Sequence, residues 1–176
     1  MDYFEALKTS PSSTAESYAH SPIPVPKATD IGSVVSYIKA NCTDLYFTSD
    51  SDEPVGVYQL SPAGLHMLEG DADKLSLPSA PAFAEFVAGN VTPNEDGFVA
   101  ERRPLGDFFK RLCGQQVSER QRKLAESLEA GFAQLTKEPG CEGAYYRVGV
   151  LPNIEIYVVI LVDGQVVGLK TLSVET

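Results

Sequence analysis

The chain has 176 residues, of which 43% are apolar and 22% are charged, and its formal net charge at pH 7 is −10. This length and composition suit one globular domain with its own core. The longest apolar run, residues 156–162, is too short to cross a bilayer, and the first residues lack the basic and apolar regions of a secretory signal. We therefore expect a soluble protein that contacts no membrane.

The cysteines and the charge distribution indicate the cellular compartment and the kind of binding partner. Cys42, Cys113 and Cys141 are odd in number and far apart, which gives neither a disulfide framework nor a CxxC metal pattern and favours the reducing cytoplasm. Residues 1–101 contain 15 acidic and 4 basic residues, whereas residues 102–176 have a net charge of +1. Such acidity repels phosphates and argues against direct nucleic-acid binding. It would attract a basic protein surface, although charge alone is better explained by solubility.

The first part of the chain predicts an arm followed by a helix and a hairpin. Residues 1–28 are rich in Ser, Pro, Ala and Thr, which predicts a flexible arm with a short helix at 2–8. The single domain, residues 29–176, opens with a helix over 31–40 that Thr29 or Asp30 can cap. Strands follow, and the pattern pairs them with each other as a hairpin. Their predicted positions are 45–48 and 55–60.

Helices dominate the middle of the chain, and strands dominate its end. Helices are predicted at 82–88, at 105–112 after Pro104, and at 118–136 with Ser118 as its cap. The last three strands, of which the final two are joined by an Asp-Gly hairpin turn, are predicted at 145–150, 154–162 and 165–173. The chain order is a helix, two strands, helices and three strands. This order predicts an α+β fold with an antiparallel β-sheet of about five strands packed with helices.

Catalytic signatures are missing from the sequence. It contains no GxSxG, P-loop, HExxH or GxGxxG motif, and neither His20 nor His66 has a second ligand at metal-binding spacing. The acid run at 50–53 is followed by Pro54 and Val55, which break the later positions of a calcium loop. We therefore expect no enzyme and no cofactor or metal of the protein's own. A small enzyme with an unrecognised site remains an alternative, and it would need a pocket of convergent polar groups.

Two stretches carry a resemblance to a known family, and a third is weaker. Residues 146–176 contain the pattern Tyr146-Arg147-Val148-Gly149, Tyr157-Val158, Gly164, Gly168, Thr171 and the final Val174-Glu175-Thr176. Residues 45–54 are a strand, a serine- and acid-rich loop and a proline, and Phe108-Phe109 with the helix at 118–136 add weaker matches. Together these stretches resemble the nuclease A inhibitor (NuiA-like) family. The arm at 1–28 and an insertion near 61–97 look foreign to the family's core, which suggests a divergent, longer member.

The resemblance implies both a function and its residues. Members of this family plug the active site of a sugar-non-specific DNA/RNA endonuclease of the ββα-metal type. The final threonine, through its hydroxyl or its carboxylate, reaches the catalytic magnesium of the nuclease. A glutamate in the loop after the first strand engages an arginine at the enzyme's catalytic site. The matching residues here are Thr176 and Asp50, of which Asp50 is one methylene shorter than the family's glutamate. The acids Asp52, Glu53 and Glu175 are expected in the same partner-binding site, mainly at its rim.

Other interpretations of these residues stay open. The chain could be a NuiA-like module that has lost nuclease inhibition and binds another basic partner. Thr176 could be a frayed chain end, and Asp50 could simply cap the hairpin turn. Tyr146 and Tyr157 fit sheet packing better than partner contact. Arg147 is expected to pair with an acid on a neighbouring strand.

Overall fold

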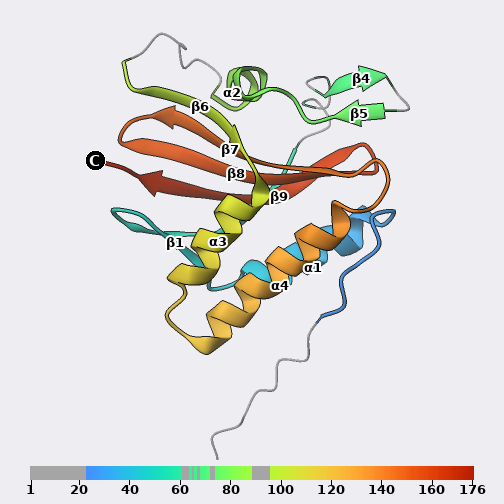
Figure 1. Cartoon of the computed structure of the whole chain (residues 1–176), viewed down its shortest axis with the longest axis horizontal. Coiled ribbons are helices and arrows are strands. Elements are labelled where there is room, and N and C mark those ends of the chain that lie inside the picture. Colours follow the sequence, from blue (N-terminus) through green and yellow to red (C-terminus); the bar gives the residue numbers. More distant parts are fainter. Residues whose placement is uncertain (1–22, 61–63, 65, 67, 72–73, 89–95) are drawn as a thin grey trace, which may run out of the picture.

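The computed structural model describes residues 23–60, 64, 66, 68–71, 74–88 and 96–176 (Figure 1). The short helix predicted at 2–8 and most of the predicted arm lie outside these described residues. Within them, helices pack on an antiparallel sheet, which confirms the predicted α+β class. None of the described helices is both long and apolar enough to cross a membrane.

The central sheet has five antiparallel strands, which are, in spatial order, β3 (Gly56–Gln59), β9 (Gln165–Val174), β8 (Asn153–Val162), β7 (Glu142–Val150) and β6 (Phe98–Arg103). The three longest strands are the last three in the chain, as predicted. The turn between β8 and β9 has Asp163 and Gly164 at φ values of 48° and 68°. Both residues tolerate this left-handed region, which the tightest hairpin turns require, so the Asp-Gly signal is confirmed.

Strand β8 is apolar along almost its whole length because both faces of the sheet are covered. Ile156, Val158 and Ile160 belong to one core cluster, and the alternate residues Tyr157 and Val159 belong to another. Successive side chains of a strand point to opposite faces, so each cluster lies on its own side of the sheet.

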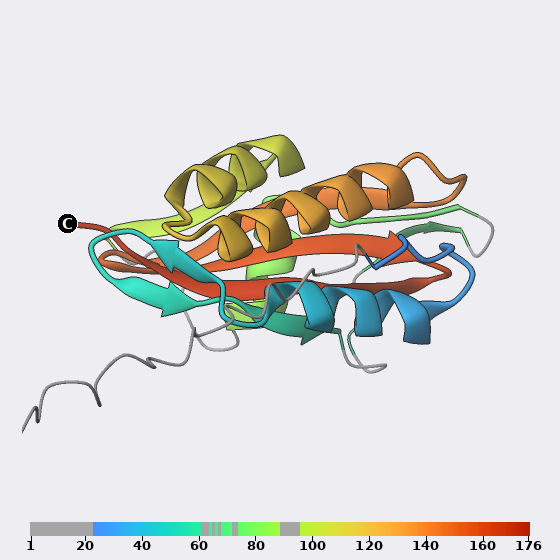
Figure 2. The ribbon, with the colours of Figure 1, turned by 90° about the horizontal axis from the view of Figure 1, so that it is seen from below.

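Three helices cover one face of the sheet side by side (Figure 2). They are α1 (Ile31–Cys42), α3 (Leu105–Gln115) and α4 (Glu119–Leu135). The side chain of Asp30 accepts a hydrogen bond from Ser33 N and caps α1. Ser118 and Gln121 form a capping box at the start of α4, which fixes where that helix begins. The sequence predicted Ser118 as a cap and left Thr29 and Asp30 as alternatives for α1, of which the structure selects Asp30.

Part of the segment predicted as an insertion supplies the core of the opposite face. It contains β4 (Glu69–Asp71), β5 (Lys74–Ser76) and α2 (Ala80–Ala88). Phe83 of α2 is fully buried, and its ring stacks on that of Tyr146 with centroids 4.0 Å apart. The Tyr146 hydroxyl donates a 2.6 Å hydrogen bond to Pro78 O. The expectation that Tyr146 packs within the sheet is therefore confirmed.

The predicted hairpin between 45–48 and 55–60 is wrong. Strand β1 (Tyr46–Thr48) pairs instead with β2 (Asp52–Pro54), which sequence reasoning missed, and β3 joins the edge of β9. A long strand such as β9 would otherwise present an open edge of unpaired backbone groups, and β3 pairs with residues 167–170 of that edge. The sheet still has five strands, but β6 replaces the predicted strand at 45–48.

Candidate functional site

Three separate segments meet at one end of the sheet, where the C-terminus lies beside the β1–β2 hairpin (Figures 1 and 2). They are the hairpin turn at 49–51, the β7–β8 turn at 151–152 and the last residues, 174–176. Asp50 N donates to Val174 O at 3.0 Å, and Glu175 N donates to Pro152 O at 2.7 Å. These backbone bonds fix the end of the chain between the two turns.

Asp50 and Thr176, the two residues that the resemblance singles out, are in direct contact. The Asp50 Oδ2 atom accepts hydrogen bonds from Thr176 N at 2.9 Å and from Thr176 Oγ1 at 2.7 Å. Ser49 adds a further tie, because its hydroxyl accepts a 2.8 Å hydrogen bond from Val174 N. The hairpin turn therefore binds the chain end through side-chain as well as backbone hydrogen bonds.

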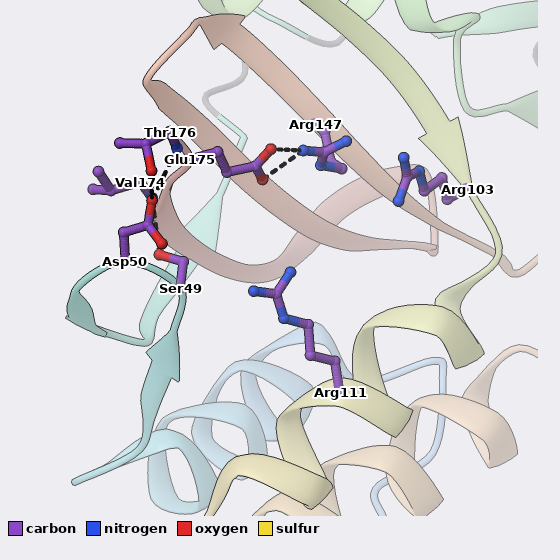
Figure 3. A pocket seen from close by; sticks show the side chains of 8 residues that line it. All are labelled: Ser49, Asp50, Arg103, Arg111, Arg147, Val174, Glu175 and Thr176. Carbon is purple, nitrogen blue, oxygen red and sulfur yellow. Dashed lines mark hydrogen bonds and ion pairs between the residues drawn. The ribbon is translucent and has the colours of Figure 1, made fainter.

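Beside this pair lies an open hollow of about 350 Å³, which we call the arginine-lined hollow (Figure 3). Three arginines lie on one side of it, and the turn and the chain end lie on the other. Its lining residues are Arg103, Arg111, Arg147, Ser49, Asp50, Val174, Glu175 and Thr176. The three arginines belong to β6, α3 and β7, so side-chain cations from three elements lie beside the chain end.

Arg147 is the most deeply held of these cations, with only 8% of its surface exposed. Its NH2 group contacts both carboxylate oxygens of Glu175, at 2.5 and 2.6 Å, and its NH1 group donates to Glu101 at 2.7 Å. Glu101 lies on β6 directly opposite Arg147. The prediction that Arg147 pairs with an acid on a neighbouring strand is confirmed. Glu175 forms an ion pair with the same arginine.

The other two arginines were not found by sequence reasoning. Arg103 forms a 2.6 Å ion pair with Glu101. Arg111 lies over the Phe47 ring at 4.6 Å and donates to Thr48 O at 3.0 Å, so it ties α3 to the hairpin. The sequence signal for them was the larger share of basic residues in 102–176. That share does not tell which strand or helix lies at this end of the sheet.

Asp52 and Glu53 lie on the hairpin but do not line the hollow. Asp52 accepts a 2.8 Å hydrogen bond from the Thr48 hydroxyl, and Glu53 accepts a 2.9 Å hydrogen bond from the Ser51 hydroxyl. These contacts lie within the hairpin and shape its turn. The structure thus brings Asp50, Glu175 and Thr176 together and leaves the two other predicted acids beside them.

The carboxylates of the site are ionised at neutral pH. Hydrogen bonds from the Thr176 hydroxyl and amide lower the pKa of Asp50. Burial opposes ionisation of Glu175, but hydrogen bonds from Arg147 and Ser173 outweigh it and lower the pKa of that carboxyl. Carboxylates with lowered pKa values are poorly suited to exchange protons near pH 7. Over the described ranges, no group of three His, Cys, Asp or Glu side chains could hold a metal ion.

No protein-family model matches this chain, and no curated protein matches it. The resemblance to nuclease A inhibitors therefore depends on the residues and spacings quoted above.

Proposed function

We propose that this chain is a cytoplasmic protein inhibitor that plugs the active site of a metal-dependent, sugar-non-specific DNA/RNA endonuclease. The observation that carries the proposal is the contact between Asp50 and Thr176 at one exposed end of the molecule. The resemblance assigns inhibitory roles to these two residues independently, although they are 126 positions apart in the chain.

The geometry at Thr176 suits an approach to a metal ion of the partner. Its hydroxyl proton is directed at Asp50, so the lone pairs of Oγ1 remain available. Magnesium prefers oxygen ligands and sits among phosphates in enzymes that cleave nucleic acids. An oxygen presented on the end of a strand can occupy such a position without being a substrate.

Asp50 retains its negative charge for an arginine of the partner. Both hydrogen bonds from Thr176 end on Oδ2, so Oδ1 of this exposed carboxylate is not used by Thr176 and can accept from a guanidinium. The acids of the hairpin, Asp52 and Glu53, add negative charge next to it. A nuclease cleft is basic because it binds phosphates, so complementary charge would speed association and make it sensitive to salt.

The experiment that tests the proposal measures inhibition of a purified ββα-metal nuclease in magnesium buffer at two salt concentrations. The full chain is compared with a variant that lacks Thr176. Two further variants form a matched pair, because Thr176→Ser keeps the hydroxyl whereas Thr176→Val replaces it with a methyl group of similar size. We expect inhibition by the full chain and by Thr176→Ser, and a large loss with Thr176→Val and with the truncation.

Full nuclease activity in the presence of excess intact chain would refute the proposal. The first alternative, a NuiA-like module that binds another basic partner, would then be tested by an unbiased pull-down. Equal inhibition by the intact chain and the truncation would keep the inhibitor but remove Thr176 from its mechanism.

A further inference from the structure

The last two residues of the sequence are held from two directions. Asp50, in the turn of the β1–β2 hairpin, accepts the two hydrogen bonds from Thr176 described above. Arg147, on β7, binds the carboxylate of Glu175 (Figure 3). The end of a chain usually frays unless such contacts fix it. The contacts of Asp50 with Thr176 are exposed to water, whereas those of Arg147 with Glu175 are partly buried.

Arg147 is held by contacts other than those with Glu175. It lies on β7 between two paired strands, and 10% of its side chain is exposed. Its NH1 group is fixed by Glu101 of the neighbouring strand at 2.7 Å. The guanidinium therefore presents its NH2 group in a defined place, and little conformational entropy is lost when Glu175 binds to it.

Glu175 is fully engaged at this place. Both of its carboxylate oxygens contact Arg147, and Oε1 also accepts a 2.9 Å hydrogen bond from the Ser173 hydroxyl. Its backbone N donates to Pro152 O at 2.7 Å. A charge-assisted contact with this many partners restricts the side chain and the backbone that follows it.

We propose that Arg147 is a positioning residue, which holds Glu175 so that Thr176 is presented to the partner in one prearranged conformation. Its importance for inhibition rests on the proposed function, whereas its hold on the chain end does not. A partner that meets an already ordered chain end avoids the entropic cost of ordering it during binding. Arg147 thereby contributes to affinity without touching the partner itself.

Release of Thr176 by carboxypeptidase Y tests the hold without any nuclease. The intact 176-residue chain is compared with Arg147→Met, which leaves the terminal sequence and hence its intrinsic cleavage rate unchanged. Cleavage requires the end to detach, so we expect release to be about tenfold faster or more in Arg147→Met. Arg147→Lys, which keeps the charge but not the planar fork, should fall between the two.

Arg102→Met is the matched control. Arg102 lies on β6 and forms an ion pair with Glu142, so this variant also loses a sheet arginine but leaves Glu175 untouched. We expect its release rate to equal that of the intact chain. Thermal unfolding of every variant confirms that cleavage is measured on folded protein. Should Arg147→Met fail to fold, Glu175→Gln with NMR relaxation of the Thr176 amide replaces it, and increased mobility is the expected result.

The inhibition assay completes the test. If the proposed function holds, Arg147→Met should raise the inhibition constant by about tenfold while Arg102→Met leaves it unchanged. Equal release of Thr176 from the intact chain and from Arg147→Met would overturn the positioning role. Faster release combined with no inhibition by the intact chain would keep the positioning role and refute the nuclease proposal instead.

Discussion

Asp50 accepts two hydrogen bonds from Thr176, one from the backbone N at 2.9 Å and one from the hydroxyl at 2.7 Å, although 126 positions separate the two residues. These hydrogen bonds join the turn of the β1–β2 hairpin to the residues that follow β9. A change at Asp50 consequently alters two things at once, the charge offered to a partner and the position of Thr176.

Substitutions at Asp50 separate these two effects. Asp50→Asn keeps an oxygen acceptor for Thr176 but removes the charge, whereas Asp50→Ala removes both. We expect Asp50→Asn to weaken nuclease inhibition mainly at low salt, because screening already reduces the contribution of charge at high salt. Asp50→Ala should weaken inhibition at both salt concentrations. Inhibition constants at 20 and 300 mM salt check this, and an identical salt dependence of the two variants would contradict it.

Acid should weaken the contribution of Glu175 to folding. The pKa of this carboxyl is lowered in the folded protein, despite burial, by hydrogen bonds from Arg147 and Ser173. Its stabilisation is therefore present above the ordinary pKa near 4.5 and is lost as the pH falls through the lower, folded value. We expect Glu175→Gln to lower the free energy of unfolding by about 1 kcal/mol at pH 7, allowing for partial exposure.

Denaturant unfolding of the intact chain and of Glu175→Gln at pH 7 and pH 3 measures this difference. The difference between the two proteins should be smaller at pH 3 than at pH 7, because the stabilisation by the ionised Glu175 is lost as the pH falls from the ordinary pKa near 4.5 through the lower, folded value. A difference that stays constant between the two pH values would show that the charge of Glu175 is unimportant.

Phe83 should be essential to the fold but not to the site. Its fully buried ring stacks on Tyr146 on the face of the sheet opposite the three helices. Phe83→Ala should lower the free energy of unfolding by about 3–5 kcal/mol. The folded fraction of this variant should still inhibit the nuclease with an unchanged constant. Val117→Ala, at a residue that is 95% exposed, is the control and should change stability by less than about 0.5 kcal/mol.

The thiol of Cys113 should be poorly reactive. Burial, together with the nearby carboxylates of Glu129 and Glu126, raises its pKa to about 11. At pH 8 the thiolate fraction is then roughly a hundredfold smaller than for a thiol of pKa 9, so alkylation by iodoacetamide should be slow. Glu129→Gln should accelerate it, whereas Glu119→Gln on the same helix should not. Mass spectrometry of the Cys113 peptide over time measures both rates.

The sequence determined those elements whose signals are local. The cap residue Ser118 marks the start of α4, and the Asp163-Gly164 turn marks the hairpin of β8 and β9, because each signal depends on residues a few positions apart. The apolar residues at 154–162 likewise indicated a strand, whereas its burial on both faces was learned only from the structure. Together these signals were sufficient for the α+β class and for the three strands that end the chain.

Tertiary structure alone decided which distant segments meet. The choice of β9 as partner for β3 depends on satisfying a sheet edge, a global requirement that the residues at 55–60 do not encode locally. In the same way, Arg111 reaches the hollow because α3 packs against β1, and Arg147 reaches Glu175 because β7 and the end of β9 flank β8. The resemblance to the nuclease A inhibitor family named Asp50 and Thr176 as separate candidates. Their contact exists because the register of the whole sheet places the chain end against the hairpin turn.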